Sequence, residues 1–316
     1  VVGITGSVGK TSTKETISSV LSEKYRVLKT LGNFNNEIGL PLTVFRLTED
    51  DEVAVLEMGI SDFGEMDRLS KIAQPDICVI TNIGFCHLEN LGTRDGILKA
   101  KTEIFNHMNP DGIVIVNGDD DKLSTISQVH GKRPLVFGIS NKDGVYADNI
   151  KSLGLDGTSF TIHGIKTSDN YSTFDLTVPV PGHHMVYNAM AAALVGSVLG
   201  LSSIEIERGV KNLKTIAGRN NIIKENGFTI IDDCYNANPV SMKASLDVLD
   251  TAIGRKVAIL GSMFELGENE KQMHYDVGMY LGTKDIDVLI TAGDLAAQIA
   301  ACLLYTSPSP RDRSVS

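Results

Sequence analysis

The chain begins with VVGITGSVGKTSTKETISSVLSEK (residues 1–24), in which an apolar run is followed by a glycine-containing loop and a helix-like segment. The apolar run predicts a β-strand, and Gly6 to Gly9 predict a tight loop. After the loop, apolar residues recur at the i, i+3, i+4 spacing of one helix face: Ile17, Val20 and Leu21. A strand, a loop and a helix in this order are typical of a parallel α/β sheet.

Further apolar runs alternate with helical or loop-like stretches, which predicts a doubly wound parallel sheet. Between about 146 and 180 the pattern changes to short alternating strands with Gly and Asp turns, which predicts a small antiparallel insertion. An Ala-rich helix is expected at 183–201. The runs predicted as strands are 53–58, 77–83, 113–116 and 135–137.

After Gly218 a second α/β pattern begins, and it predicts a Rossmann-like second domain with strands at 229–231, 257–260 and 288–291. We therefore expect a nucleotide-binding domain at 1–218 and a second domain at 219–302. The remaining segment is rich in Ser, Pro and Arg and has no periodicity. A natural flexible tail would have this composition, but we expect 303–316 to be a non-native tail.

Composition excludes several classes of protein. With 29 Lys and Arg against 39 Asp and Glu, the net charge of −10 argues against a nucleic-acid-binding protein. The longest apolar stretch is interrupted by Asn188 and glycines, so no membrane insertion is expected. The four cysteines form no C-x-x-C pair, and no signal-peptide pattern is visible, so we expect a cytoplasmic protein.

The strongest motif for chemistry is TGSVGKT, between the first strand and the first helix. Glycines allow backbone N–H groups to converge on phosphate oxygens, while a lysine reaches the phosphates and a threonine hydroxyl can bind Mg²⁺. The motif departs from G-x-x-x-x-G-K-[ST], because Ile4 stands where that pattern has its first glycine. A simple glycine turn is the alternative. The residues expected to bind phosphate are Thr5, Gly6, Ser7, Val8, Gly9, Lys10 and Thr11.

Two further residues follow predicted strands. Glu57 ends the run VAVLE, where a magnesium ligand beside a phosphate loop would lie, although a solvated strand-end charge fits equally well. His87 lies in the loop TNIGFCHLENLG after the next strand. It could bind a metal ion, but from the spacing alone a residue that caps the loop is the better interpretation.

Other charged residues carry weaker signals. Lys99 and Lys101 lie on one predicted helix, where lysines are usually solvated surface charges. Arg219 lies where the two α/β patterns join and could reach a nucleotide, although an arginine in a linker usually faces solvent. Asp232 and Asp233 end a strand, which indicates either a ribose or metal contact or simply a turn.

Taken together, these motifs resemble the Mur ligase family, and within it the MurF type. The resemblance covers residues 1 to about 300, and the segment after the paired aspartates is its most discriminating part. The motifs are TGSVGKT, NFNNEIGLP, LEMGISDFGEM, TNIGFCHLENLG, KAKTEIF, GHHMVYNAMAAA, AGR, DDCYNANP and LGSMFELGE.

The resemblance implies ATP and two Mg²⁺ ions as cofactors. By this likeness Lys10 and Thr11 hold the phosphates and the first Mg²⁺, with Glu57 as a metal ligand. His87 would bind the second Mg²⁺. Lys101 matches the lysine that family members carbamylate to make a carboxylate-like metal ligand.

The resemblance also implies roles for three residues farther along the chain. Asn188 would contact the adenine, Arg219 the terminal phosphate and Asp233 the ribose of ATP. In this scheme Lys10, Glu57, His87, Lys101 and Arg219 are the catalytic residues.

The implied activity is an ADP-forming amide ligation that joins D-Ala-D-Ala to UDP-MurNAc-tripeptide through an acyl phosphate, in the synthesis of peptidoglycan precursors. Family members place a UDP-substrate domain before the residue that is Val1 here, so we expect this chain to bind ATP but to ligate weakly or not at all. A monomer is expected. The alternatives are a ligase of the folylpolyglutamate or cyanophycin synthetase type, a P-loop NTPase or kinase, and a nucleotide-binding regulatory module.

Overall fold

The computed structural model describes residues 1–306, and the side chains of residues 1–303. The chain forms two compact units, which divide between Thr215 and Ile216. The predicted boundary after 218 lies close to this division. Of the predicted tail, 303–306 continue the last helix, α10 (Ala297–Thr306), and 307–316 lie outside the described residues.

The first unit is built on a nine-stranded sheet in the order β2-β3-β1-β4-β5-β6-β7-β8-β9. All pairings from β2 to β7 are parallel, whereas β7, β8 and β9 pair antiparallel. The predicted α/β class with an antiparallel insertion is therefore confirmed, and the insertion extends the edge of the main sheet. The strands are β1 (Val2–Thr5), β2 (Val27–Lys29), β3 (Val53–Glu57), β4 (Ile77–Ile80), β5 (Ile113–Asn117), β6 (Leu135–Gly138), β7 (Val145–Ser152), β8 (Thr158–His163) and β9 (Thr173–Val178).

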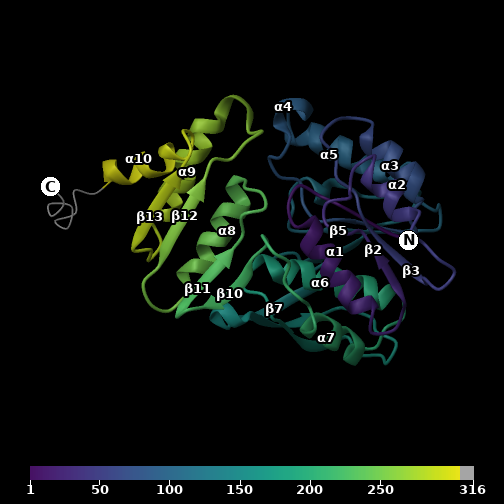
Figure 1. Cartoon of the computed structure of the whole chain (residues 1–316). Helices are drawn as coiled ribbons and strands as arrows, with labels where there is room; N and C mark the ends of the chain where they lie inside the picture. The colour runs from purple at the N-terminus through teal and green to yellow at the C-terminus, as the bar shows by residue number, and fades with distance from the viewer. Residues whose placement is uncertain (307–316) are drawn as a thin grey trace. The chain divides into compact units, whose positions relative to one another are not determined.

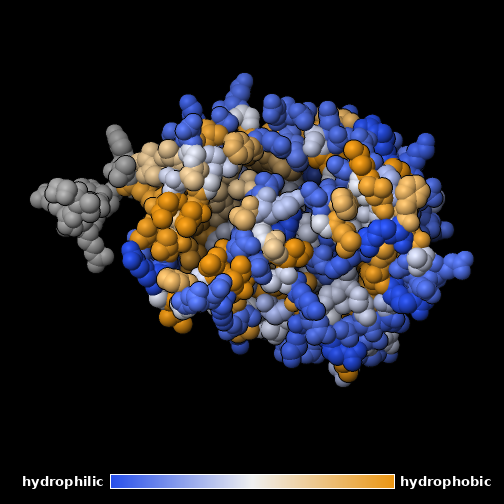
Figure 2. Space-filling model, in the orientation of Figure 1, coloured by the Kyte–Doolittle hydropathy of each residue, from blue (hydrophilic) through white to orange (hydrophobic). Residues whose placement is uncertain are grey.

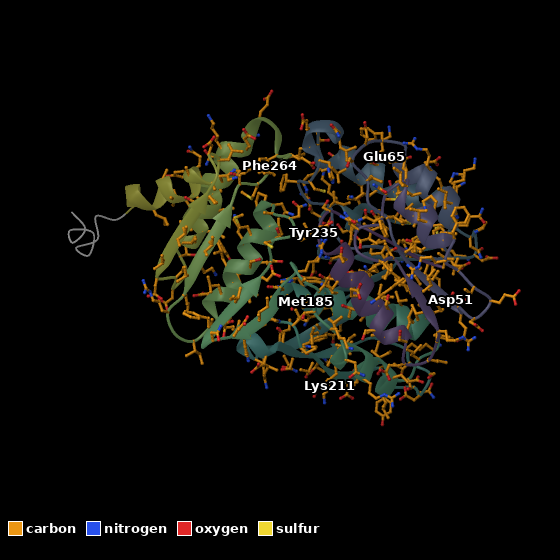
Figure 3. All side chains as sticks on the ribbon, in the orientation of Figure 1. Asp51, Glu65, Met185, Lys211, Tyr235 and Phe264 are labelled. Atoms are coloured by element: carbon orange, nitrogen blue, oxygen red, sulfur yellow. The ribbon has the colours of Figure 1, made fainter. Side chains whose placement is uncertain are left out.

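Helices cover both faces of this sheet, and side chains fill the two layers between them (Figures 1 and 3). One core contains apolar residues of α1 and α6, and the other contains those of α3 and α5. The helical segments are α1 (Lys10–Leu21), α2 (Gly39–Val44), α3 (Glu65–Ala73), α4 (Leu88–Leu91), α5 (Arg94–Thr102), η1 (Glu103–Phe105), η2 (Leu123–Thr125), η3 (Gly154–Asp156), α6 (His184–Val198) and α7 (Ser203–Lys211).

Helix α1 is packed closely against α6 and α7 because glycines face it. A Cβ at Gly209 would lie 2.4 Å from the Cα of Val20, and one at Gly196 would lie 2.9 Å from the Cγ1 of Val20. Ser19 Oγ also donates a 2.6 Å hydrogen bond to the Gly209 carbonyl. The helix that follows the glycine loop is thus held along its length by the core.

The second unit begins with a hairpin in which β10 (Asn221–Glu225) pairs antiparallel with β11 (Phe228–Asp232). The predicted strand 229–231 lies in this hairpin, and its partner β10 was not predicted. Parallel pairing follows between β12 (Val257–Gly261) and β13 (Val288–Ala292). The helical segments are α8 (Pro239–Asp250), η4 (Gly267–Asn269), α9 (Glu270–Leu281) and α10.

Apolar side chains reach the surface in both units (Figure 2). In the first unit, Ile38, Leu42 and Phe45 at α2 are exposed, Phe45 to 84%. In the second unit, apolar residues of the strands are exposed, such as Phe228 and Ile230 of β11. No helix in the described part of the chain combines the length and the apolar character needed to cross a membrane.

Candidate nucleotide-binding site

The glycine loop joins the end of β1 to the start of α1 and depends on its two glycines. Gly6 has φ 149°, and a Cβ there would lie 1.9 Å from Oγ1 of Thr81. Gly9 is left-handed, with φ 82°, and forms the N-cap of α1 without a side-chain cap. Only glycine fits the first position, because it combines a disfavoured φ with direct steric overlap.

Lys10 folds over this loop. Its Nζ donates hydrogen bonds to the carbonyl oxygens of Gly6, at 2.9 Å, and Ser7, at 3.4 Å. The ammonium group is therefore held above the loop at the positive end of α1, where an anion would be stabilised. Lys10 and the loop predicted from the sequence lie together at the carboxyl end of β1.

Glu57 ends β3, the neighbour of β1, and its side chain is buried, with 1% exposed. Its Oε1 accepts a 3.0 Å hydrogen bond from Thr11 Oγ1 and a 2.8 Å bond from Asn35 Nδ2. Its Oε2 is buried without a hydrogen-bond partner, and Lys14 Nζ lies 3.8 Å from it. A buried carboxylate oxygen without a donor, next to a threonine hydroxyl, fits a hard cation such as Mg²⁺.

This carboxylate is not part of a complete protein-only metal site. Among residues 1–303, no group of three or more His, Cys, Asp or Glu side chains is placed to hold a metal ion. Mg²⁺ is usually bound by one or two carboxylates together with substrate phosphates and water. A magnesium ion at Glu57 would therefore depend on phosphate oxygens supplied by a nucleotide.

Lys101, on α5, is 1% exposed, so the interpretation of this lysine as a solvated surface charge is wrong. Burial, and to a smaller extent repulsion by Lys10, lower the pKa of Lys101 to about 8, although Cys86 acts in the opposite direction. Lys99, by contrast, is exposed, and its Nζ lies 5.9 Å from the centre of the Phe63 ring. A buried amine of lowered basicity is the chemically unusual lysine of this helix.

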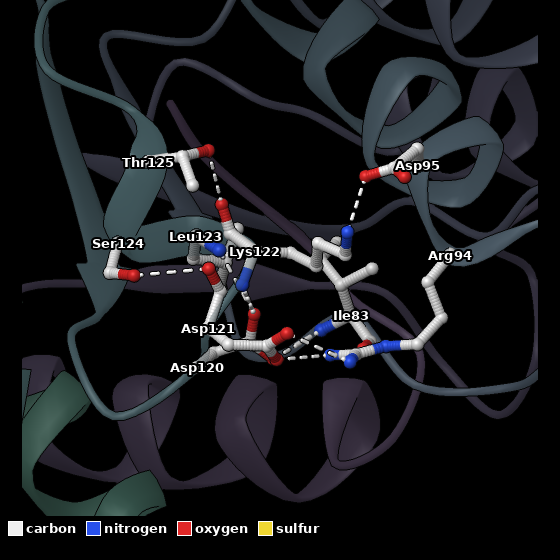
Figure 4. Close-up of polar contacts among 9 residues, drawn as sticks. All are labelled: Ile83, Arg94, Asp95, Asp120, Asp121, Lys122, Leu123, Ser124 and Thr125. Atoms are coloured by element: carbon white, nitrogen blue, oxygen red, sulfur yellow. Dashed lines mark hydrogen bonds and ion pairs between the residues drawn. The ribbon is translucent and has the colours of Figure 1, made fainter.

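His87 lies in the segment between β4 and α5, where it is half-buried and has φ 55° at the N-cap of α4. Arg94 holds the start of this segment (Figure 4): its Nε and Nη2 donate to the Ile83 carbonyl at 3.0 and 2.8 Å. The Ile83 amide donates to Asp120 Oδ2 at 2.8 Å. Arg94 also pairs with Asp121. Both main-chain groups of Ile83 are therefore fixed.

Asn188 of α6 is buried beneath the loop. Its Oδ1 accepts a 2.9 Å hydrogen bond from Thr13 Oγ1, and a Cβ added at Gly9 would lie 3.4 Å from the same oxygen. Its Nδ2 lies 3.2 Å from the sulfur of Met185, a residue labelled in Figure 3. The structure therefore brings Asn188 next to the glycine loop.

Arg219 and Asp233 lie together in the second unit. The Arg219 guanidinium stacks 4.2 Å from the ring centre of Tyr235, a residue also labelled in Figure 3. The Asp233 carboxylate accepts hydrogen bonds from the Asn220 amide, at 3.1 Å, and from Ser245 Oγ. Burial raises the pKa of Asp233, although these hydrogen bonds and Arg219 partly offset the effect.

Four residues that contact Glu57, its neighbours or the glycine loop were not predicted from the sequence. Asn35 bonds Glu57, Thr30 Oγ1 accepts from the Glu57 amide at 3.0 Å, and the buried Lys14 Nζ donates to the Thr30 carbonyl at 2.8 Å. Asn82 contacts the loop from the end of β4. Two of these residues could have been found from the sequence. Asn35 lies in the motif NFNNEIGLP, and Lys14 directly follows the first turn of the helix that begins at the glycine loop.

Comparison with known proteins follows the division into two units. The profile of the Mur ligase middle domain matches residues 4–196, and that of the Mur ligase glutamate ligase domain matches residues 218–312. The UDP-N-acetylmuramoyl-tripeptide–D-alanyl-D-alanine ligase of Bacillus subtilis is 43% identical over 303 residues, 95% of this chain. The chain spans 64% of that relative's length.

Solved structures agree with this assignment. MurF from Acinetobacter baumannii matches with a TM-score of 0.87 and 35% identity, over 95% of this chain and 64% of that one. MurF from Thermotoga maritima in complex with ADP matches with a TM-score of 0.83 and 32% identity, over 94% of this chain and 68% of that one. The profile match, the sequence identity and the structural likeness together show that the chain belongs to the Mur ligase family.

Proposed function

We propose that this chain is the nucleotide-binding part of an ADP-forming amide ligase of the MurF type. The observation that carries the proposal is the buried Glu57 carboxylate. One of its oxygens accepts a hydrogen bond from Thr11 of the glycine loop, and the other has no hydrogen-bond donor. The relatives named above for D-alanyl-D-alanine ligation support the substrates, UDP-MurNAc-tripeptide and D-Ala-D-Ala. The proposed place of action is the cytoplasm, and the proposed state is a monomer.

In this proposal the first domain comprises 1–218 and the second begins at 219. The loop from Thr5 to Thr11 holds the ATP phosphates, and Asn188 contacts the adenine. Arg219 and Asp233 act from the second domain, on the terminal phosphate and the ribose. The likeness to a MurF structure with ADP supports nucleotide binding.

The chemistry proposed is activation of a carboxylate, which is a poor acyl donor at neutral pH. The carboxylate oxygen of the tripeptide attacks the γ-phosphorus of ATP and ADP leaves, which gives an acyl phosphate. The amine of D-Ala-D-Ala then attacks the acyl carbon, loses a proton and displaces phosphate. Lys10 and Arg219 offset the repulsion between the two anions that must meet.

Two Mg²⁺ ions are proposed as cofactors, and when bound they neutralise phosphate charge. Thr11 and Glu57 would hold the first. His87 would hold the second together with Lys101, whose buried amine is proposed to react with CO₂ and release a proton, giving a carbamate. Incubation with ¹³C-bicarbonate should give a carbamate ¹³C signal that is absent from a Lys101→Arg variant. A folded, Mg²⁺-loaded protein without that signal contradicts the carbamate.

The activity is tested by following phosphate release with ATP, Mg²⁺, UDP-MurNAc-tripeptide and D-Ala-D-Ala. We expect calorimetry to detect Mg²⁺-dependent ADP binding, and any phosphate release to require both substrates. Release without D-Ala-D-Ala would favour an NTPase. ADP binding that is absent from the folded chain would contradict the proposed site itself. Glutamate in place of D-Ala-D-Ala tests the folylpolyglutamate alternative.

A further inference from the structure

Two main-chain amides of the glycine loop donate hydrogen bonds to another part of the protein and do not point toward a ligand on the loop. The Ser7 amide donates to the main-chain oxygen of Asn82 at 2.9 Å. The Val8 amide donates to Oδ1 of the same asparagine, also at 2.9 Å. An N–H group has one hydrogen to donate, so neither amide is available to a phosphate in this arrangement.

The Val8 carbonyl is held from the same side. It accepts a 2.9 Å hydrogen bond from Asn82 Nδ2 and a 2.6 Å bond from Thr81 Oγ1. The Asn82 side chain therefore bonds both main-chain groups of Val8, as a neighbouring strand would. Because β4 lies beside β1, with Thr5 opposite Ile80, the two residues after β4 are well placed to continue this pairing into the loop.

The amides that remain available begin at Gly9. Those of Lys10, Thr11 and Ser12 lie in the first turn of α1, and the amide of Thr13 is the first to bond within the helix, to the Gly9 carbonyl at 2.8 Å. Among the described residues, none accepts a hydrogen bond from the amides of 9–12. The first turn of a helix leaves such groups for an anion, and the helix dipole adds to their attraction.

The backbone next to Asn82 is itself held by hydrogen bonds. The next residue, Ile83, is bonded at its amide by Asp120 and at its carbonyl by Arg94 (Figure 4). The asparagine can thus restrain the loop, because the backbone of the residue that follows it is fixed to the start of α5 and to the segment between β5 and η2.

We propose that Asn82 is a positioning residue of the glycine loop, which turns the Ser7 and Val8 amides away from the nucleotide and leaves phosphate binding to the amides of residues 9–12. This inference rests on the proposed nucleotide site. It concerns the shape of the loop before the nucleotide arrives, and Asn82 makes no contact with the phosphates.

The first test uses Asn82→Ala and measures ADP affinity by calorimetry well below the unfolding midpoint. Loss of two hydrogen bonds from the loop should weaken ADP binding about tenfold. The matched control is Asn109→Ala, which removes one donated and one accepted bond, to Asp76 and from the Asp111 amide, at the amino end of β5. The control should bind ADP within about twofold of the unsubstituted chain. Equal affinity in Asn82→Ala and the control overturns the proposal.

The second test needs no substitution, so it holds even if Asn82→Ala does not fold. In ¹⁵N NMR spectra, the Ser7 and Val8 amides should exchange slowly with solvent both before and after ADP is added, whereas the amides of 9–12 should become protected only with ADP. New phosphate bonds at Ser7 or Val8, seen as ³¹P–¹⁵N couplings, overturn the inference. A chain that binds no ADP contradicts the proposed function and not the bonding of Asn82.

Discussion

The Thr11 hydroxyl donates a 3.0 Å hydrogen bond to Oε1 of Glu57, and so joins the first turn of α1 to the end of β3. Asn35 adds a second donor to the same oxygen, while the other carboxylate oxygen has none. The carboxylate is thus fixed in orientation through one oxygen and is available through the other. This asymmetry is the basis of the first prediction.

Glu57→Gln should remove the Mg²⁺-dependent part of ADP binding and leave the metal-independent part within about threefold. The amide keeps an oxygen for Thr11 and Asn35 but loses the charge that a cation needs. We expect the gain in ADP affinity that Mg²⁺ provides to fall by at least about tenfold. Even residues that only hydrogen-bond to a metal ligand change metal affinity by about this factor when they are substituted. Calorimetry with and without Mg²⁺ measures it, with Glu37→Gln, on the surface, as control. An unchanged Mg²⁺ effect in Glu57→Gln rules out the ligand role.

Gly6→Ala should destabilise the first unit by about 3 kcal/mol, because the new methyl group overlaps the Thr81 hydroxyl and the φ value is one that only glycine adopts readily. Gly131→Ala is the control. It also has a positive φ, but nothing lies within 4 Å of its Cβ position, so about 1 kcal/mol is expected. Urea unfolding gives both values, and similar losses in the two variants would refute the steric argument.

Asp119 should contribute stability that depends on pH. Burial opposes its ionisation, but hydrogen bonds from the amides of 139–141 and from the Tyr187 hydroxyl lower the pKa of its carboxyl below the ordinary 3.8. The unfolded chain therefore binds the proton more readily, so this stability is present above pH 3.8 and is lost as the pH falls through the lower folded pKa.

Asp119→Asn should accordingly cost about 2 kcal/mol at pH 7, and the difference from the unsubstituted chain should shrink below pH 4. Unfolding by urea at pH 3 to 7 measures this. Asp143→Asn, at an exposed carboxylate, is the control. A difference that stays constant across this range would contradict the assigned cause.

Arg94→Lys should loosen the segment that carries His87. A lysine has no planar fork, so it cannot bond the Ile83 carbonyl and Asp121 together as Arg94 does. We expect faster hydrogen exchange across 82–92 and a loss of about 1–2 kcal/mol. Exchange mass spectrometry measures this, with the exposed Arg133→Lys as control. If exchange in 82–92 is equal in the two variants, Arg94 does not restrain this segment.

The sequence predicted those parts of the fold that depend on local pattern. The loop from Gly6 to Gly9 and the buried strands β1, β3, β4 and β5 follow from apolar runs and glycines that can be read without knowing their neighbours. Strand β2 was missed because it has only three residues, one of them Lys29. Strand β10 was missed because its two apolar residues, Ile222 and Ile223, are too few to form an apolar run, and its pairing with β11 is visible only in the fold.

Some residues of the candidate site could likewise be predicted from local pattern, whereas others become visible only in the fold. Lys10, Thr11 and Glu57 were predicted, because each stands at a recognisable point of a motif or strand end. The burial of Lys101 could not be derived from its spacing on α5, since burial depends on what packs against the helix. Asn82 bonds Val8, 74 residues away in sequence, so its contribution is visible only once β4 lies beside β1. The structure gives the positions of these residues, and the roles proposed for Lys10, Thr11, Glu57, His87, Lys101, Asn188, Arg219 and Asp233 stay predictions.

The close packing of α1 against Gly196 and Gly209 has a consequence for how a ligand is received. A helix that cannot slide keeps its first turn, and with it the amides of 9–12, in one position. The conformational entropy of that turn is thus lost when the chain folds and not when a nucleotide associates. A phosphate group meets donors that are already aligned, so substitutions that loosen Gly209 or Val20 should weaken binding without touching the ligand.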